Sequence, residues 1–139
     1  MNIEAKQKME VLSWEEEGFR PLISFGDWLV ALLNWELRFD KASVGQVERH
    51  NETDEVFVLL QGHSIIFVVD DESAKVKDME PGVVYNVTRS AWHSVIGDRS
   101  AKWLIVESNT TSQENSDFRP LNEQELRSLE SQYPKWLLA

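Results

Sequence analysis

The sequence contains no cysteine, which excludes disulfides, thiolate metal ligands and cysteine nucleophiles. Glycine is scarce, with six residues, and no glycine-rich phosphate loop or dinucleotide fingerprint is present. No apolar run approaches the roughly 18 residues that cross a bilayer. The first residues also lack the apolar segment of a signal peptide. From these absences we expect a cytoplasmic protein without a membrane-spanning segment.

Basic residues are also few, with 14 Lys and Arg against 24 Asp and Glu and a formal net charge of −10. Nucleic-acid-binding domains usually carry a basic patch, and no cluster of Lys or Arg occurs here. The same acidic balance disfavours binding to an anionic membrane surface. We therefore expect neither nucleic acid nor membrane among the partners of this protein.

Short β-prone segments are abundant instead. Eight or so strands are predicted between residues 22 and 107, with turn signals every ~8–12 residues. No helical pattern of ten residues interrupts them, which disfavours a parallel α/β sheet. The 139 residues correspond to one ordinary domain. We predict a single all-β domain over residues 1–139, an antiparallel sandwich or barrel whose core spans about 22–110.

Helices are expected only at the two ends of the chain. Asn122 and Glu125 form a capping pair, followed by apolar residues at helical spacing, and Pro134 stops the pattern. This pattern predicts a C-terminal helix over about 122–133 that packs against the outside of the barrel. Residues 3–12 mix apolar and charged side chains, so a short N-terminal helix is also predicted there.

The three histidines suggest where the chemistry lies. Glu48 lies two residues before His50, so on a strand both side chains leave from the same face. Glu55 opens the next strand and His93 a later one, and inward-facing residues of separate strands meet near the mouth of a barrel. We predict a cluster of these four residues that binds a metal or a ligand. His63 follows a turn, and we expect it at the surface.

The stretch from Glu48 to Gly62 resembles the first sequence motif of the cupin family. That motif runs glycine, five residues, His-x-His, three or four residues, glutamate, six residues, glycine. His50, Glu55 and Gly62 match the second histidine, the glutamate and the final glycine. Glu48 stands where the first histidine belongs, and Ala42 stands at the opening glycine.

A later stretch is similar to the second cupin motif, which runs glycine, five residues, proline, x, glycine, two residues, histidine, three residues, asparagine. Gly82 and His93 fit this spacing without a gap. Thr88, Ser90 and Gly97 replace the proline, the second glycine and the asparagine. Both motifs fall within the predicted barrel.

The resemblance implies an antiparallel cupin or jelly-roll β-barrel that binds a small molecule. In the family, the motif histidines and glutamate bind a divalent metal, which assigns His50, Glu55 and His93 as ligands here. Glu48 is the candidate fourth ligand, and iron, manganese, nickel and zinc are the candidate ions. Cupins commonly pair through sheet edges, so a homodimer is also implied.

The replacement of one family ligand leaves an alternative open. In it, no metal is bound, Glu48 is held by Arg49 or Arg38, and the histidines line a polar pocket. Three functions follow as hypotheses: a metal-dependent enzyme acting on a small oxygenated substrate, a sensor or carrier that binds a ligand without turnover, and an interaction protein with a vestigial pocket.

Three further residues are predicted to line the pocket. Asn34 and Arg38 are polar positions in an otherwise apolar strand region, and a period of two places them on one face. Trp92 directly precedes His93. On a strand it faces away from the site, but at the strand opening it can form the pocket rim.

Overall fold

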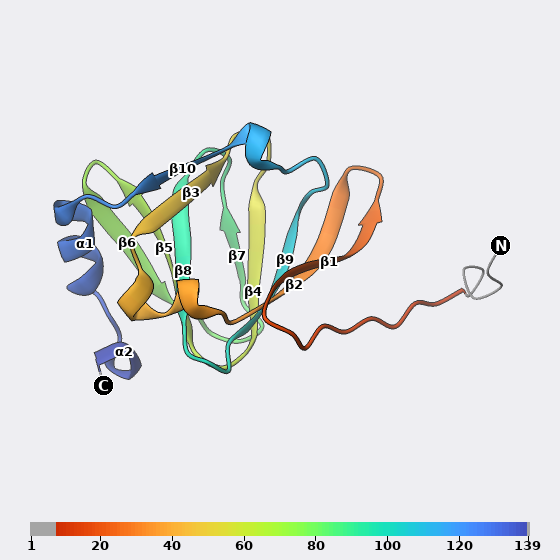
Figure 1. Cartoon of the computed structure of the whole chain (residues 1–139), viewed down its shortest axis with the longest axis horizontal. Coiled ribbons are helices and arrows are strands. Elements are labelled where there is room, and N and C mark those ends of the chain that lie inside the picture. The colour runs from red at the N-terminus through yellow and green to blue at the C-terminus, as the bar shows by residue number, and fades with distance from the viewer. Residues whose placement is uncertain (1–7, 139) are drawn as a thin grey trace.

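The computed structural model describes residues 8–138, which form two five-stranded antiparallel sheets packed face to face (Figure 1). Sheet A contains, in spatial order, β1 (Gly18–Phe25), β2 (Trp28–Asn34), β9 (Lys102–Ser108), β4 (Glu55–Gln61) and β7 (Val84–Val87). Sheet B contains, in spatial order, β10 (Ser116–Pro120), β3 (Gln46–His50), β8 (Trp92–Gly97), β5 (Ser64–Asp70) and β6 (Ser73–Asp78). This jelly-roll sandwich confirms the all-β prediction.

Alternation of side chains along the strands builds the core between the sheets. In β9, Trp103 and Ile105 are buried, whereas Leu104 and Val106 on the other face are half-buried. The same period of two runs through β2 and β4, because successive residues of a strand point to opposite faces. The inward-facing side chains of sheet A therefore meet those of sheet B in one apolar cluster.

The turn between β4 and β5 requires the glycine that closes the first motif. Gly62 has φ of +77°, in the left-handed region that favours glycine. A Cβ atom there would lie 2.7 Å from the backbone nitrogen of Ala101. The turn is therefore both left-handed and closely packed, and both conditions exclude a larger residue.

The C-terminal helix forms as predicted. Helix α1 (Glu123–Glu130) begins after Asn122, whose side chain accepts a hydrogen bond from the backbone N–H of Glu125, and the Glu125 carboxylate accepts one from the N–H of Asn122. Leu129 is fully buried against the outer face of sheet B. A short helix α2 (Lys135–Leu138) follows. Among residues 8–138, no helix has the length and hydropathy needed to cross a membrane.

Two strands were not predicted from the sequence. Strand β1 contains Gly18 and Pro21, which are unfavourable inside a strand, but an edge strand tolerates proline because its nitrogen need not pair. Strand β10 lies in a polar stretch and pairs with β3. Conversely, β2 ends at Asn34, and the chain then forms 3₁₀ turns η2 (Leu37–Phe39) and η3 (Lys41–Ser43).

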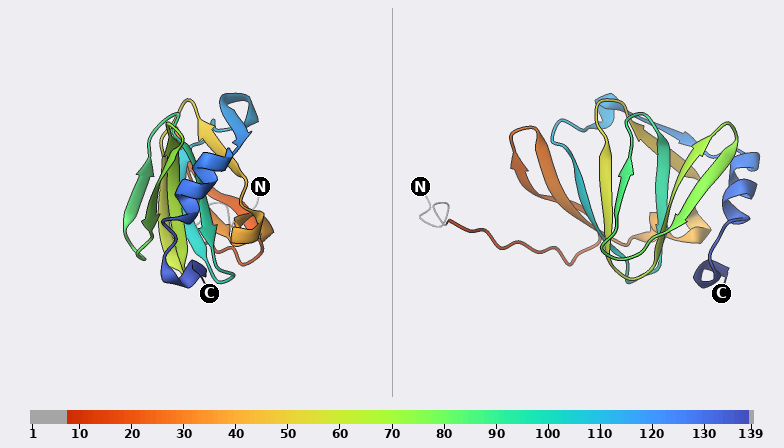
Figure 2. Two further views of the ribbon diagram at one scale, coloured as in Figure 1. Left: turned by 90° about the vertical axis from the view of Figure 1, so that its left-hand side faces the viewer. Right: turned by 180° about the vertical axis from the view of Figure 1, so that it is seen from behind.

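The predicted N-terminal helix is wrong for the residues that the structure describes. Residues 8–17 contain no helix, and Figure 2 shows this segment leading away from the sandwich. Residues 3–7 of the predicted helix lie outside the described part. The mixed pattern of residues 3–12 lacks a helical apolar stripe, and propensity alone does not hold so short a helix.

Candidate metal centre

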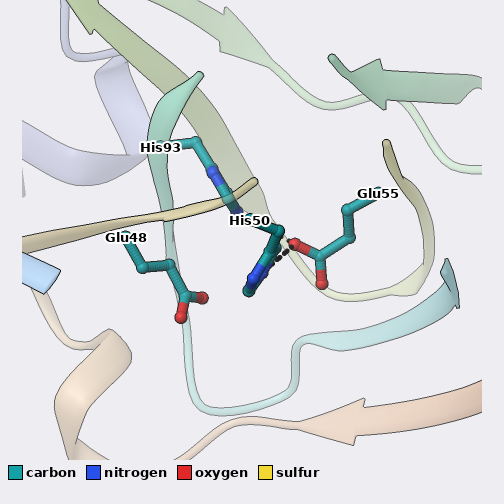
Figure 3. Close-up of side chains that lie close together, drawn as sticks. All are labelled: Glu48, His50, Glu55 and His93. Carbon is teal, nitrogen blue, oxygen red and sulfur yellow. Dashed lines mark hydrogen bonds and ion pairs between the residues drawn. The ribbon is translucent and has the colours of Figure 1, made fainter. Parts of the chain in front are cut away.

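Four side chains converge at one end of the interior of the sandwich. Glu48 and His50 come from β3, Glu55 is the first residue of β4, and His93 is the second residue of β8. Each offers one ligand atom, and these atoms all lie within 4.8 Å of one another. Figure 3 shows the side chains pointing into a common space. The predicted convergence of these residues is therefore present.

Strand register explains the convergence. Glu48 of β3 lies opposite His93 of β8 in the antiparallel pairing, so their side chains leave the sheet on the same face. His50 follows two residues after Glu48 and keeps that face. Glu55 belongs to the facing sheet A, where it opens β4 after a tight polar turn. The two sheets thus place their donors across the core from each other.

Both imidazoles contact the same carboxylate oxygen. The Nε2 atoms of His50 and His93 lie 3.0 Å and 2.9 Å from Oε1 of Glu55. The two rings are 5.4 Å apart in an edge-to-face arrangement. All three side chains are at least nine-tenths buried, with His93 only 1% exposed. The three side chains are therefore largely shielded from bulk solvent and held by mutual contacts.

The far sides of the imidazoles are also held. Nδ1 of His93 lies 2.9 Å from the carbonyl oxygen of Ala91, which can only accept, so Nδ1 carries the hydrogen. In neutral His93 the Nε2 lone pair then faces the Glu55 carboxylate, and only a proton or a cation makes that contact favourable. Nδ1 of His50 lies 2.8 Å from the hydroxyl of Ser116. Outer hydrogen bonds of this kind orient metal-binding histidines.

The pKa values follow from this charge arrangement. Burial by itself would lower the pKa of His50 and His93, but the hydrogen bonds to Glu55 and its negative charge raise both above the ordinary value. Burial would likewise raise the pKa of Glu55, but the two imidazoles lower it to about 2. The carboxylate thus stays ionised and attracts positive charge, whether that is a proton on each ring or a metal ion.

Neither arginine that could hold Glu48 does so. Arg38 pairs with Glu36, and Arg49 pairs with Asp117 at 2.8 Å. The Glu48 carboxylate points into the space shared with His50 and Glu55 (Figure 3). This placement favours Glu48 as a member of the cluster over the alternative in which an arginine neutralises it.

A fifth residue, the acidic Glu107, borders the four-residue cluster and was missed in the sequence. It lies opposite Glu55 in the pairing of β9 with β4, is 8% exposed, and its Oε2 has no hydrogen-bond partner among the described residues. Burial and the negative charge of Glu55 raise the pKa of Glu107 to about 8. Glu107 continues the alternation of Trp103 and Ile105 along the strand, and residues on that face point inward. This pattern in the sequence could have identified Glu107 as a buried residue.

A small cavity of ≈ 80 Å³ adjoins the cluster. Glu48, Glu55 and His93 supply its polar wall, and Arg38 lies at its margin. Its apolar wall consists of Phe19, Leu33, Phe39, Val47, Phe57, Val95, Ile105 and Phe118. Arg38 also borders a neighbouring hollow of ≈ 100 Å³. Apart from His93, Arg38 is the only basic residue among the described residues that line this cavity.

The other predicted residues lie elsewhere. Asn34 does not line this cavity; its side-chain amide donates to the carbonyl oxygens of Trp14 and Glu16, at the end of β2 away from the cluster. Trp92 lies on the outer face of sheet B, between the guanidinium groups of Arg49 and Arg119. Strand β2 ends at Asn34, so Asn34 and Arg38 do not share one strand face. Strand β8 already includes Trp92, so its side chain faces away from that of His93 and the predicted rim position is wrong.

The expected surface position of His63 is present. Its ring contacts Asp98 at 2.9 Å and stacks on Trp136, far from the cluster.

The donor set near His93 is two imidazoles and two carboxylates, which suits Fe(II), Mn(II), Ni(II) or Zn(II) and disfavours Cu(I). The Nε2 atom of His93, which faces the ionised Glu55 carboxylate, also fits a divalent cation. The residues present can therefore hold such an ion.

Comparison with known proteins gives structural likenesses only. No protein-family model matches the sequence, and no curated protein matches it. A solved cupin-2 domain-containing protein from Shewanella frigidimarina NCIMB 400 is 21% identical, covers 78% of this chain and 94% of its own, and superposes with a TM-score of 0.51.

Two solved enzymes superpose on this chain with similar TM-scores. A variant of Streptomyces Pac13 with uridine is 9% identical, covers 80% of this chain and 85% of its own, and gives a TM-score of 0.57; Pac13 is described as a nucleoside dehydratase. A variant of the 3,4-ketoisomerase QdtA from Thermoanaerobacterium thermosaccharolyticum, in complex with TDP-4-keto-6-deoxyglucose, is 14% identical, covers 63% of each chain, and gives 0.53. At these identities the likeness is one of fold.

Proposed function

We propose that this chain, which has the cupin fold, holds one divalent metal ion with Glu48, His50, Glu55 and His93 and acts on a small oxygen-bearing substrate beside it. The observation that carries the proposal is the convergence of four donor atoms within 4.8 Å of one another inside the sandwich. Two imidazoles and two carboxylates are ligands that these ions accept, with positions left for a substrate.

Each protein group has a separable role in this proposal. Ala91 and Ser116 hold the imidazoles of His93 and His50 so that both Nε2 atoms face the centre. Glu107 keeps a proton beside Glu55, because burial disfavours its charged form. A bound ion would supply Lewis acidity to an oxygen atom of the substrate. The apolar wall of the cavity excludes bulk water from the same space.

The cavity restricts the substrate. The cavity is small, with a volume of ≈ 80 Å³. Either the substrate is small or only its reacting end enters. Uridine and TDP-4-keto-6-deoxyglucose, which were solved with Pac13 and QdtA, are oxygen-rich small molecules, and they support this class. Arg38 at the margin adds a preference for a carboxylate or another anionic group.

The ion pairs among His50, Glu55 and His93 favour a second candidate function, a metal-free binding pocket. In this state the protonated rings donate hydrogen bonds to the Glu55 carboxylate, so these groups have partners without an ion. The protein would then bind a small polar ligand and release it unchanged. This candidate keeps the same cavity and the same Arg38, and differs in the occupant of the donor cluster.

Titration calorimetry on chelator-treated protein distinguishes the two. Under the proposal, Mn(II), Fe(II), Ni(II) or Zn(II) binds with one ion per chain, and His50→Ala abolishes the heat while circular dichroism retains the β spectrum. His63→Ala, a histidine away from the cluster, is the matched control and leaves binding unchanged. Absence of binding for all four ions in the wild-type protein contradicts the metal site and leaves the metal-free pocket.

Catalysis is tested separately from metal binding. The metal-loaded protein is incubated with small 2-oxo acids, hydroxy acids and keto sugars, and the solution is followed by NMR. Conversion that depends on the ion and is lost in His50→Ala supports an enzyme. Saturable binding with quantitative recovery of the unchanged compound supports a sensor or carrier.

A further inference from the structure

Strand β6 turns its polar side chains towards the interior of the sandwich. Its sequence SAKVKD alternates between apolar and polar residues, and Ala74 and Val76 belong to the apolar cluster under α1 and α2 on the outer face of sheet B. Lys75 and Lys77 therefore lie on the inner face, where Lys77 is opposite Ile66 of the core. Both lysines are exposed, so this part of the inner face is open to solvent.

A hollow of ≈ 310 Å³ opens at this place, between β6 and β7. These strands are edge strands of sheets B and A, and β7 is only four residues long. Ile66 and Val68 of β5 and Val87 of β7 line the hollow with apolar side chains, as does Val84, which is 65% exposed. The hollow therefore presents apolar surface to solvent beside the two lysines.

The two lysines form a positively charged wall of this hollow. Lys75 and Lys77 are two positions apart on β6, about 6.6 Å along the strand, so their flexible side chains can reach one anionic group. Among residues 8–138, neither ammonium group has a hydrogen-bond or ion-pair partner. No acidic residue is among the described residues that line the hollow, although the chain has 24 acidic residues and 14 basic ones. The charge of this wall complements an anion.

Inward-pointing lysines on an edge strand also have a structural explanation, because such charges prevent the edge from pairing with another sheet. That protection needs only the charge. The hollow places an apolar surface next to the charge, and the two together match a molecule with an apolar part and an anionic end. We propose that the hollow between β6 and β7 binds an aliphatic monocarboxylate, with its carboxylate at Lys75 and Lys77 and its chain against Val68 and Val87.

The lining of the hollow favours a carboxylate over a phosphate group. Its described residues all lie on strands, and none of them is an arginine. Phosphate sites commonly use a helix N-terminus or a planar guanidinium group, and neither is present in this lining. Each ammonium group carries three hydrogen-bond donors, so two of them can bind both oxygens of one carboxylate. Burial of methylene groups against the apolar side chains then adds affinity as the chain of the ligand lengthens.

This hollow is distinct from the cavity beside the proposed metal centre. No described residue lines both, and the cavity is bordered instead by β1 and β10, which end the two sheets on the other side. The hollow still adjoins the centre, because Val68 lies opposite His93 and Val87 lies opposite Glu55 in the strand pairings. A carboxylate bound here would lie one strand away from two of the proposed ligands without needing the metal ion.

Titration of the metal-free full chain with octanoate at pH 7 tests the proposal. Saturable binding at one site is expected, and acetate, which has the same carboxylate without the chain, should bind at least about tenfold more weakly. Lys75→Gln/Lys77→Gln is expected to raise the octanoate Kd about tenfold, since each exposed ion pair contributes modestly. Arg127→Gln/Lys135→Gln removes two positive charges from exposed positions on α1 and α2, and this matched control should leave the Kd unchanged.

NMR locates the bound octanoate independently of the variants. Intermolecular NOEs from its methylene protons to the methyl groups of Val68, Val84 and Val87 are expected. NOEs to Phe57 and Ile105 instead would place the chain in the cavity beside the metal centre and overturn the proposal. Absence of saturable binding at millimolar octanoate overturns it as well, as does an equal loss of affinity in the two double variants. The protein is metal-free throughout, so these results are independent of the proposed function.

Discussion

Glu107 lies directly opposite Glu55 on neighbouring strands of sheet A, and both carboxyl groups are buried. Two like charges at this separation in a dry site disfavour each other, so the pair holds one proton. The imidazoles of His50 and His93 keep Glu55 ionised, with a pKa of about 2, and the proton remains on Glu107, whose pKa rises to about 8. Glu55 is therefore the ionised carboxylate of the pair, and Glu107 is the neutral acid beside it.

Replacing Glu107 by Gln is expected to stabilise the metal-free protein at pH 7. Wild-type Glu107 must stay protonated in the folded state, whereas in the unfolded chain it ionises. At ~1.4 kcal/mol per pKa unit, the interval from the ordinary pKa of 4.5 to pH 7 gives an expected gain on the order of 3 kcal/mol. Thermal or urea unfolding of metal-free protein measures it, and Glu114→Gln on an exposed turn serves as the control.

The pH dependence gives the same prediction a second test. The pKa of Glu107 is higher in the folded than in the unfolded state. Its favourable contribution to the free energy of unfolding is therefore fully present below the ordinary pKa of 4.5, and it is lost as the pH rises to about 8. The advantage of Glu107→Gln should therefore be absent at pH 4, grow between pH 4.5 and 8, and then level off. A pH-independent difference would argue against a protonated Glu107.

His93→Ala is expected to destabilise the protein much more than His63→Ala. His93 is 1% exposed, and its removal leaves the buried Glu55 carboxylate without one of its two partners. Breaking a buried charge pair in this way costs about 3 kcal/mol or more. His63 pairs with Asp98 at the surface, where such a pair is worth less than about 1 kcal/mol. Equal losses in urea unfolding would contradict the buried pairing.

Glu55→Gln should make the free energy of unfolding depend less on pH in acidic solution. Glu55 has a folded-state pKa of about 2, below its ordinary value of 4.5, so it contributes stability above pH 4.5 that is lost as pH falls towards 2. The wild-type protein should therefore lose its advantage over Glu55→Gln across that interval. Unfolding followed by tryptophan fluorescence between pH 2 and 7 measures both proteins. A constant difference over the whole interval is the contrary result.

Arg38→Gln is expected to weaken the binding of small carboxylates, with oxalate as the probe. Its guanidinium lies at the margin of the cavity and its side chain is 58% exposed, so the substitution should leave stability nearly unchanged. Loss of one charge-assisted hydrogen bond predicts about a tenfold rise in Kd. Arg49→Gln, which removes an arginine from the outer face of sheet B, is the control for net charge.

Much of the site could be predicted because spacing along a strand fixes the face of each side chain. Glu48 and His50 are two residues apart in β3, and Glu55 and His93 each stand near the start of a strand. The sequence also marks Asn122 and Glu125 as the cap of α1, because the capping contacts are local. Local patterns of this kind were sufficient to predict the sandwich, the C-terminal helix and the four-residue cluster.

Features that depend on distant pairing were not predictable in the same way. Ser116 reaches His50 because β10 pairs with β3 across 66 positions of sequence, and the polar composition of β10 hides its strand character. Glu107 follows the buried face of β9, but its proximity to Glu55 depends on the β9–β4 register. Asn34 was placed at the pocket because composition does not show which face of β2 points inward, and the buried residues are the alternate ones such as Ala31 and Leu33.

The central claim is tested most directly by the metal content of the purified, untagged protein and of its His93→Ala and Glu48→Ala variants. After incubation with Mn(II), Fe(II), Ni(II) or Zn(II) and removal of free ion, elemental analysis should find about one ion per wild-type chain. Loss of that ion in folded His93→Ala and weaker retention in Glu48→Ala are the predicted results. A wild-type protein that retains none of the four ions would contradict the metal site.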